Sequence, residues 1–292
     1  MIPVTKHNYY RPKNTMENFT IEIDPITRPP LEYGKELIQN AIEINDLKDG
    51  KLYALYSGGI DSEMLLEVFL SQKIDITPVI IKLSPNYNDY DLKYAYQFCK
   101  NKNITPLMLD INIDEFIQTG EIIKLSEKIG PCPYQMMPII NETLKIDGTV
   151  LSGNNEPYFG PDESTGKWYL IDKEYLCLWN RLYESKQLIG TPSFLSWSAE
   201  TMLAFCLDPT INKLATNQLI GKKGTYSSRN EVYSRTFPLE PRPKYTGWER
   251  LESLPIFSHE NIKYIIEYKN KGNGIFKKEY TELITHLQNK IK

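Results

Sequence analysis

The 292-residue chain has little cysteine and histidine, with four cysteines and three histidines. Its four cysteines lie far apart and form no C-x-x-C pair, which argues against a disulfide framework and a structural zinc site. The three histidines show no ligand spacing either. No apolar run approaches the length of a membrane span, and the N-terminus carries no continuous apolar segment. We therefore expect a cytoplasmic protein with reduced cysteines and no membrane association.

An excess of positive charge is also missing. The net charge is −3, so the chain has no overall positive field that would attract nucleic acid. No Gly-x-x-x-x-Gly-Lys-Ser/Thr string occurs, which argues against a Walker-type NTPase. Gly-x-Gly-x-x-Gly and His-Glu-x-x-His strings are absent as well.

Short apolar segments alternate with helix-period segments through the first half of the chain. The pattern predicts strands at 52–56, 76–83, 106–111 and 149–151, and helices at 62–72, 89–101, 114–119 and 133–146. This alternation is typical of a parallel sheet with helices on both faces. We therefore expect an α/β fold with a doubly wound, mostly parallel sheet.

The flanking regions differ from this central part. Residues 1–45 read as an N-terminal arm with a strand-like stretch at 19–23 and a helix at 33–44, before the sheet domain at 46–190. Residues 191–292 read as a mainly helical region, with a basic, turn-rich segment at 221–250. The helices expected there are 197–207, 209–219, 260–271 and 276–291. The polar, Gly- and Pro-rich stretch 154–168 has the length and composition of a lid.

The string Ser57-Gly58-Gly59-Ile60-Asp61-Ser62 lies between the first core strand and the next helix. Adjacent glycines let the backbone approach a ligand closely, and N–H groups at a helix N-terminus bind phosphate well. Ser57 and Ser62 add hydroxyl donors. The Asp61 carboxylate would repel a phosphate unless a divalent cation such as Mg²⁺ lay between them. A capped Gly-Gly turn is the alternative interpretation.

In this context the string resembles the signature of the PP-loop ATP pyrophosphatases, a superfamily that includes the synthetase domain of asparagine synthetase. The resemblance covers residues 50–160 and implies a five-stranded, HUP-like sheet. It implies that Ser57, Gly58, Gly59 and Ser62 bind the pyrophosphate part of ATP. It also implies that Asp61 binds Mg²⁺ and acts in catalysis.

The resemblance implies further binding positions after two other strands. The backbone at Ile81 is expected to contact adenine, although a buried strand explains this segment equally well. Gly153 ends a Leu-Ser-Gly segment that is expected beside the glycine loop, and Glu156 is expected to share the metal with Asp61. A polar turn after a strand is the alternative for residues 152–156.

Cations in the second half are candidates for stabilising the departing pyrophosphate. The resemblance implies one downstream lysine in this catalytic role, and Lys222, Lys223 and Lys244 all qualify. A solvated basic loop is the alternative. Arranged as a groove, the cations of this region could instead bind RNA; they are Lys222, Lys223, Arg229, Arg235, Arg242 and Lys244.

The resemblance implies an ATP-dependent, AMP-forming ligase or amidotransferase-like enzyme. A carbonyl oxygen of a small-molecule acceptor would be adenylated with release of pyrophosphate, and an amine or ammonia would displace AMP. Too few residues precede the motif for a glutaminase domain, so we expect ammonia, another amine or a partner glutaminase to supply nitrogen. Two alternatives stay open: nucleobase or tRNA modification, with nucleic acid not favoured, and a non-catalytic ATP- or AMP-binding regulator.

Overall fold

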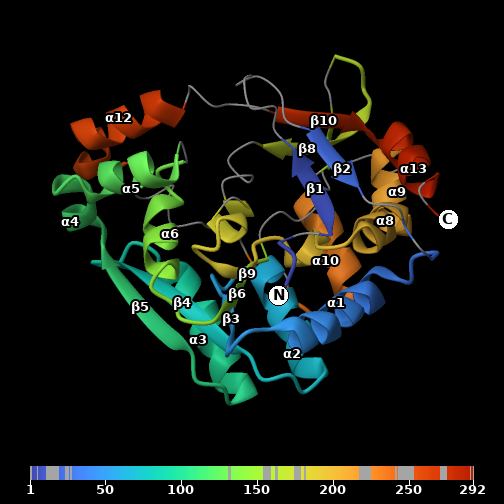
Figure 1. Cartoon of the computed structure of the whole chain (residues 1–292), viewed down its shortest axis with the longest axis horizontal. Helices are drawn as coiled ribbons and strands as arrows, with labels where there is room; N and C mark the ends of the chain where they lie inside the picture. Colours follow the sequence, from blue (N-terminus) through green and yellow to red (C-terminus); the bar gives the residue numbers. More distant parts are fainter. Residues whose placement is uncertain are drawn as a thin grey trace.

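A five-stranded, all-parallel sheet lies at the centre of the computed structural model (Figure 1). The strands lie in the order β5-β4-β3-β6-β9. The residues described by the structure are 2–4, 6–10, 20–23, 26, 28–130, 133–153, 159–161, 164–173, 179–180, 182–216, 225–240, 242, 253–269, 275–289 and 291. Helices flank the sheet, so the expected α/β fold with a parallel sheet is confirmed.

Most strands and helices of the sheet region agree with the sequence pattern, but the helix Glu121–Ile129 and the strand Ile189–Thr191 were not predicted. The strands are β3 (Leu52–Leu55), β4 (Thr77–Ser84), β5 (Leu107–Asn112), β6 (Thr149–Leu151) and β9 (Ile189–Thr191). The connecting helices are α2 (Ile60–Ser71), α3 (Asp89–Lys102), α4 (Ile113–Gln118), α5 (Glu121–Ile129) and α6 (Met137–Thr143). The N-terminal helix α1 spans Tyr33–Leu47.

Each face of the sheet has its own hydrophobic core, because successive strand residues point to opposite sides. Ala54 of β3 and Ile80 of β4 are buried against α1, α2, α3 and α8 (Ala199–Leu207). Leu55 and Val79, one residue away, are buried against α4, α5, α6 and α12 (Glu260–Lys269). The chain thus covers one face with α2 and α3 and the other with α4 to α6.

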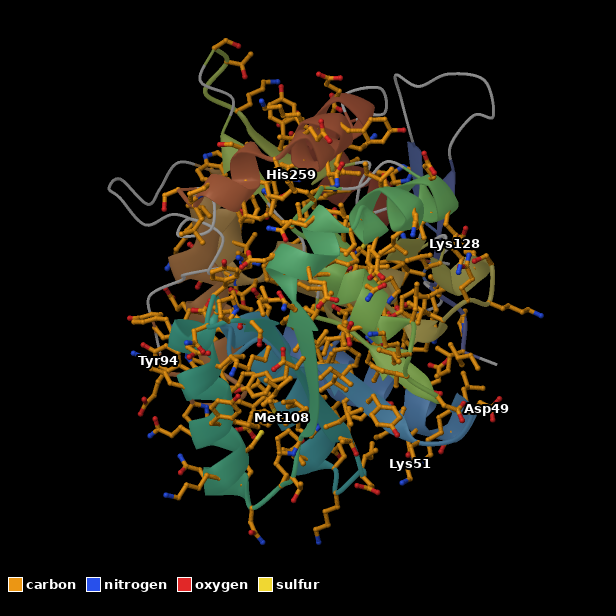
Figure 2. All side chains as sticks on the ribbon, turned by 90° about the vertical axis from the view of Figure 1, so that its left-hand side faces the viewer. Asp49, Lys51, Tyr94, Met108, Lys128 and His259 are labelled. Carbon is orange, nitrogen blue, oxygen red and sulfur yellow. The ribbon has the colours of Figure 1, made fainter. Side chains whose placement is uncertain are left out.

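The rest of the chain packs around this sheet. The arm forms an antiparallel pair, β1 (His7–Tyr10) with β2 (Thr20–Ile23). The strand-like stretch 19–23 predicted β2, whereas β1 was not predicted. A second antiparallel sheet joins β7 (Phe159–Pro161), β8 (Trp168–Lys173) and β10 (Ile275–Glu279). The later helices are α9 (Pro209–Ala215), α10 (Thr225–Ser234) and α13 (Tyr280–Gln288), with short 3-10 turns at Phe194–Ser196 and Pro255–Ser258. Figure 2 faces the β5 edge of the central sheet and shows Met108 on it.

Some local predictions were wrong. Residues 276–279 were expected to begin a helix, but they belong to β10, which pairs with β8 along its whole length. The helix α10 replaces turns over part of the basic segment 221–250. β7 and β8 occupy part of the stretch expected as a lid. For β10 the pairing partner, β8, is distant in the sequence, and local propensity does not report such a partner.

Within the described part of the chain, no helix is both long enough and apolar enough to cross a membrane.

Candidate functional site

The glycine loop joins β3 to α2, as its sequence predicted. Gly58 has a φ of 78°, and a Cβ there would lie 2.5 Å from the backbone oxygen of Asp91 on α3. Both the left-handed backbone and the contact with α3 therefore require glycine. Gly59 is the N-cap of α2 in an extended conformation, with φ −81°, and no side chain caps this helix. The first N–H groups of α2 are therefore left without a side-chain cap.

This loop lies where the strand order of the sheet reverses. From β3 the chain moves outward to β4 and β5, then returns to the other side of β3 to form β6 and β9. Ligands of open parallel sheets bind beyond the strand ends at such a reversal. Gly153, just after β6, was expected beside the loop and does lie there, because a Cβ on it would be 2.9 Å from the backbone oxygen of Asp61.

The two serines of the motif face each other across the loop. Their hydroxyl oxygens are 3.3 Å apart, and the Ser62 hydroxyl also donates to the backbone oxygen of Gly59 at 3.1 Å. The Gly59 N–H donates to the Ser57 hydroxyl at 3.4 Å, a long and weak bond. Weak internal bonds leave these donors ready to exchange partners for a phosphate oxygen.

Asp61, in the first turn of α2, contacts two side chains of α10. Its Oδ1 accepts a hydrogen bond from the Tyr233 hydroxyl at 2.9 Å and lies 3.3 Å from Nη1 of Arg229. Arg229 is only 4% exposed, whereas Asp61 is 20% exposed. No described residue donates a hydrogen bond to Oδ2 of Asp61. One oxygen of this carboxylate is thus held, and the other has no hydrogen bond from the described residues.

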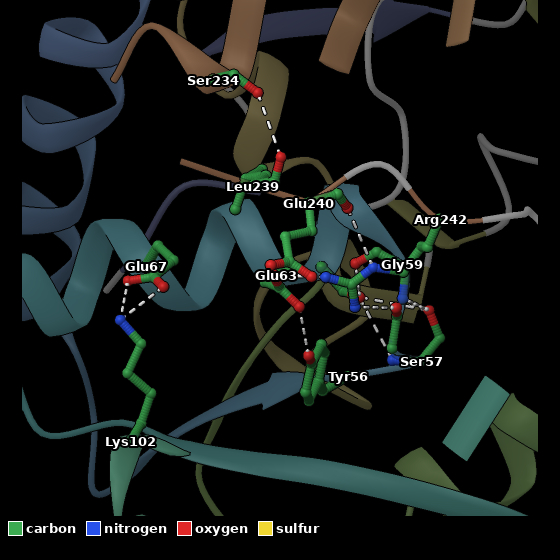
Figure 3. Close-up of polar contacts among 12 residues, drawn as sticks. Tyr56, Ser57, Gly59, Glu63, Glu67, Lys102, Ser234, Leu239, Glu240 and Arg242 are labelled. Atoms are coloured by element: carbon green, nitrogen blue, oxygen red, sulfur yellow. Dashed lines mark hydrogen bonds and ion pairs between the residues drawn. The ribbon is translucent and has the colours of Figure 1, made fainter. Parts of the chain in front are cut away.

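Glu63, two residues after Asp61 on α2, is enclosed more completely (Figure 3). Its Oε1 accepts from Nη2 of Arg242 at 2.7 Å, and its Oε2 accepts from the Tyr56 hydroxyl at 2.7 Å. Nη1 of Arg242 donates to the backbone oxygen of Gly58 at 2.8 Å, and the guanidinium lies over the ring of Tyr94. Burial and the charge of Glu63 raise the pKa of Tyr56. One arginine therefore ties the strand end, the loop and the helix together.

The end of β4 is bridged by an asparagine. The Asn88 amide donates to the backbone oxygen of Ile81 at 2.8 Å and accepts from the N–H of Leu83 at 2.9 Å. Asn88 is the N-cap residue of α3, yet its side chain makes no cap bond there. A nucleobase that used the Ile81 carbonyl would therefore share it with this amide or displace it.

The structure brings together Ser57, Gly58, Gly59, Asp61 and Ser62 with Gly153. Glu156, Lys222, Lys223 and Lys244 lie outside the described residues. From the sequence, Arg229 and Arg242 were candidates only for the groove that the RNA-binding alternative would need, and their pairing with the carboxylates of α2 was not predicted. The only sequence signal for these ion pairs was the presence of two acidic residues, Asp61 and Glu63, at the start of the helix. That signal does not indicate which cations pair with them.

The oxygen ligands at the loop are compatible with a Mg²⁺ ion that is also coordinated by phosphates. Such an ion needs only one or two carboxylate ligands from the protein. Asp61 would hold the ion through Oδ2, its open oxygen. The described residues contain no cluster of three or more His, Cys, Asp or Glu side chains that could hold a metal without such help. No protein-family model matches the chain, and a search of curated proteins finds no match.

Proposed function

We propose that the chain is an ATP-dependent, AMP-forming enzyme of the PP-loop type, similar to the synthetase domain of asparagine synthetase. One observation carries the proposal: the Ser-Gly-Gly-x-Asp-Ser loop opens α2 at the point where the strand order reverses. That is where an open parallel sheet binds its ligand, and this loop has the donors for phosphate.

The chain's own residues would act as follows. The N–H groups of the loop and the hydroxyls of Ser57 and Ser62 would bind the pyrophosphate part of ATP. Asp61 would hold Mg²⁺, which would offset the charge of the phosphates. A carboxylate or amide oxygen of the acceptor would form a bond to the α-phosphorus as the bond to pyrophosphate breaks. An amine would then form a bond to the activated carbon, and AMP would leave with the electron pair.

Enzyme and sensor are separated by measuring pyrophosphate and AMP together. The full chain is incubated with ATP, Mg²⁺ and panels of amino acids and nucleobase acids, with ammonia as amine, and products are identified by mass spectrometry. AMP and pyrophosphate in equal amounts, dependent on one acceptor, support the proposal. ATP binding without acceptor-dependent turnover across the panels would instead favour a nucleotide-binding regulator, and absence of ATP binding would refute the site.

The described arginines offer little to the alternative of an RNA-binding groove. Arg229 pairs with Asp61, and Arg242 pairs with Glu63. Arg235 pairs with Asp208 and with Glu231. Cations that are already neutralised by carboxylates add little to a field that would attract a polyanion. Binding of tRNA that weakens steeply as salt rises would argue against this interpretation.

A further inference from the structure

The Asp61 carboxylate has a cation beside it even before any metal binds. A lone carboxylate at a phosphate loop would repel the ligand, and the sequence alone points to a divalent ion as the remedy. In the structure the guanidinium of Arg229 lies 3.3 Å from Oδ1 of Asp61. Charge-assisted bonds of this kind are usually 2.7–2.9 Å long, so the pair is loose.

We propose that Arg229 is a phosphate-binding residue that leaves Asp61 for the pyrophosphate part of the ligand, so that the loop binds pyrophosphate without a divalent cation. This deepens the proposed function and rests on it for the identity of the ligand as ATP. On exchange, the guanidinium would donate to phosphate oxygens, and Asp61 would keep its bond from the Tyr233 hydroxyl, which is 2.9 Å long.

The geometry favours Arg229 over Arg242 for this role. Arg242 is fixed by three partners at once: the carboxylate of Glu63, the backbone oxygen of Gly58 and the ring of Tyr94. Moving it would release the loop that it holds. The contact of Arg229 with Oδ1 of Asp61 is longer, at 3.3 Å. Its carboxylate partner also keeps a second donor in Tyr233, so Arg229 can turn away without stranding Asp61.

The position of α10 supports the same assignment. Arg229 and Tyr233 are four residues apart on this helix and so share one face, which reaches the first turn of α2. Tyr233 is fully buried and stacks on Tyr33 of α1, with ring centroids 6.0 Å apart. This packing fixes α10 against the first turn of α2 and places a buried positive charge next to the Asp61 carboxylate.

The test is binding of inorganic pyrophosphate to the full chain in EDTA, measured by calorimetry. Wild type should bind, and Arg229→Gln should bind at least tenfold more weakly. Asp61→Asn should bind pyrophosphate more tightly than wild type in EDTA, because it removes the repulsive charge, while its Mg²⁺-dependent turnover of ATP falls. Arg235→Gln is the control, because Arg235 directly follows α10 and pairs with Asp208 rather than with Asp61, and it should bind like wild type.

Arg229→Gln could unfold because it leaves Asp61 without its cation. The double variant Asp61→Asn/Arg229→Gln removes both charges and keeps the test valid: it should fold and still bind pyrophosphate weakly. Wild-type affinity in a folded Arg229 variant, or no binding by wild type in EDTA, would overturn the inference. If wild type then still turns over ATP with Mg²⁺, the proposed function stands and only the inference fails. If pyrophosphate binds in EDTA but ATP is never turned over, the inference about Arg229 stands and the proposed function fails.

Discussion

Asp61 and Glu63 lie in the same turn of α2, and each faces an arginine from the C-terminal part of the chain, but their surroundings differ. Glu63 is 8% exposed and both of its oxygens accept bonds of 2.7 Å. Asp61 is 20% exposed and has one oxygen engaged, with its arginine at 3.3 Å. Both oxygens of Glu63 are therefore hydrogen-bonded, whereas one oxygen of Asp61 has no hydrogen bond from the described residues.

Within three residues, one carboxylate therefore supports the structure of the loop and the other is available to bind a ligand. A saturated, buried pair fixes geometry and has nothing left for a ligand, whereas a loosely held carboxylate can change partners. Arg242 extends the support to the loop itself by binding the backbone oxygen of Gly58. The Glu63 side therefore keeps the loop in shape, and the Asp61 side faces the ligand.

The largest effect on stability is expected for Glu63→Ala. It leaves the Arg242 guanidinium, 11% exposed, without its carboxylate and removes the acceptor of Tyr56. Loss of one partner of a buried pair costs about 3–5 kcal/mol. The matched control is Glu67→Ala on the same helix, whose partner Lys102 is 40% exposed (Figure 3), and it should cost less than about 1 kcal/mol. Equal costs in urea unfolding would show that Glu63 does not support the loop.

Substitutions of the two loop glycines should also differ, with one affecting mainly stability and the other mainly ATP binding. Gly58→Ala should destabilise the protein by about 2 kcal/mol, because φ is 78° and the new Cβ would meet the backbone of Asp91 at 2.5 Å. Gly59 has an ordinary φ, and among the described residues a Cβ there would meet only the Ser57 hydroxyl, at 3.4 Å. Gly59→Val should therefore fold but bind ATP poorly, because its side chain blocks the phosphate. Wild-type ATP affinity in folded Gly59→Val would place the phosphate elsewhere.

Asp61→Asn should change activity strongly and stability less than Glu63→Ala does. The amide oxygen can still accept from Tyr233 and Arg229, but Arg229, 4% exposed, loses its counter-charge. The cost should therefore lie between about 1 kcal/mol, for a weakened hydrogen bond, and about 3–5 kcal/mol, for a broken buried pair. Mg²⁺-dependent release of pyrophosphate should fall at least about tenfold, equivalent to roughly 1.4 kcal/mol. Thermal unfolding and turnover are measured on the same sample. Unchanged turnover would remove Asp61 from the mechanism, and a loss of stability as large as that of Glu63→Ala would assign it to support instead.

The sequence predicted the sheet region well because the signals there are local. The apolar run 52–56, the two glycines and the helix-period residues after them are adjacent in the chain, and together they specify strand, loop and helix. Gly153 could also be placed, since parallel strands end at the same edge of a sheet. The strand β9 has three residues, too few for a periodic signal.

The partners of α2 could not be predicted, because they depend on contacts between distant parts of the chain. Arg229 lies 168 residues from Asp61, and Arg242 lies 179 residues from Glu63. Nothing in the spacing of a basic segment shows which of its cations will be buried. The segment also contains α10, whose polar composition hid its helical structure. The sequence therefore indicated cations near the loop, and the fold determines which described ones reach it.

The smallest effect is the pH dependence contributed by Tyr56, which tests whether the Glu63 side is closed to solvent. Burial and the charge of Glu63 raise the pKa of Tyr56 above its ordinary value of 10.0. A group whose pKa is raised by folding contributes stability that is complete below the ordinary pKa and is lost at higher pH. Tyr56→Phe loses a hydrogen bond, so it should be less stable than wild type by about 1 kcal/mol near pH 8. This difference should shrink as the pH rises past 10, because only wild type must keep Tyr56 protonated. Urea unfolding of both proteins between pH 8 and 11 measures it, and a difference that stays constant would mean that the hydroxyl is solvated.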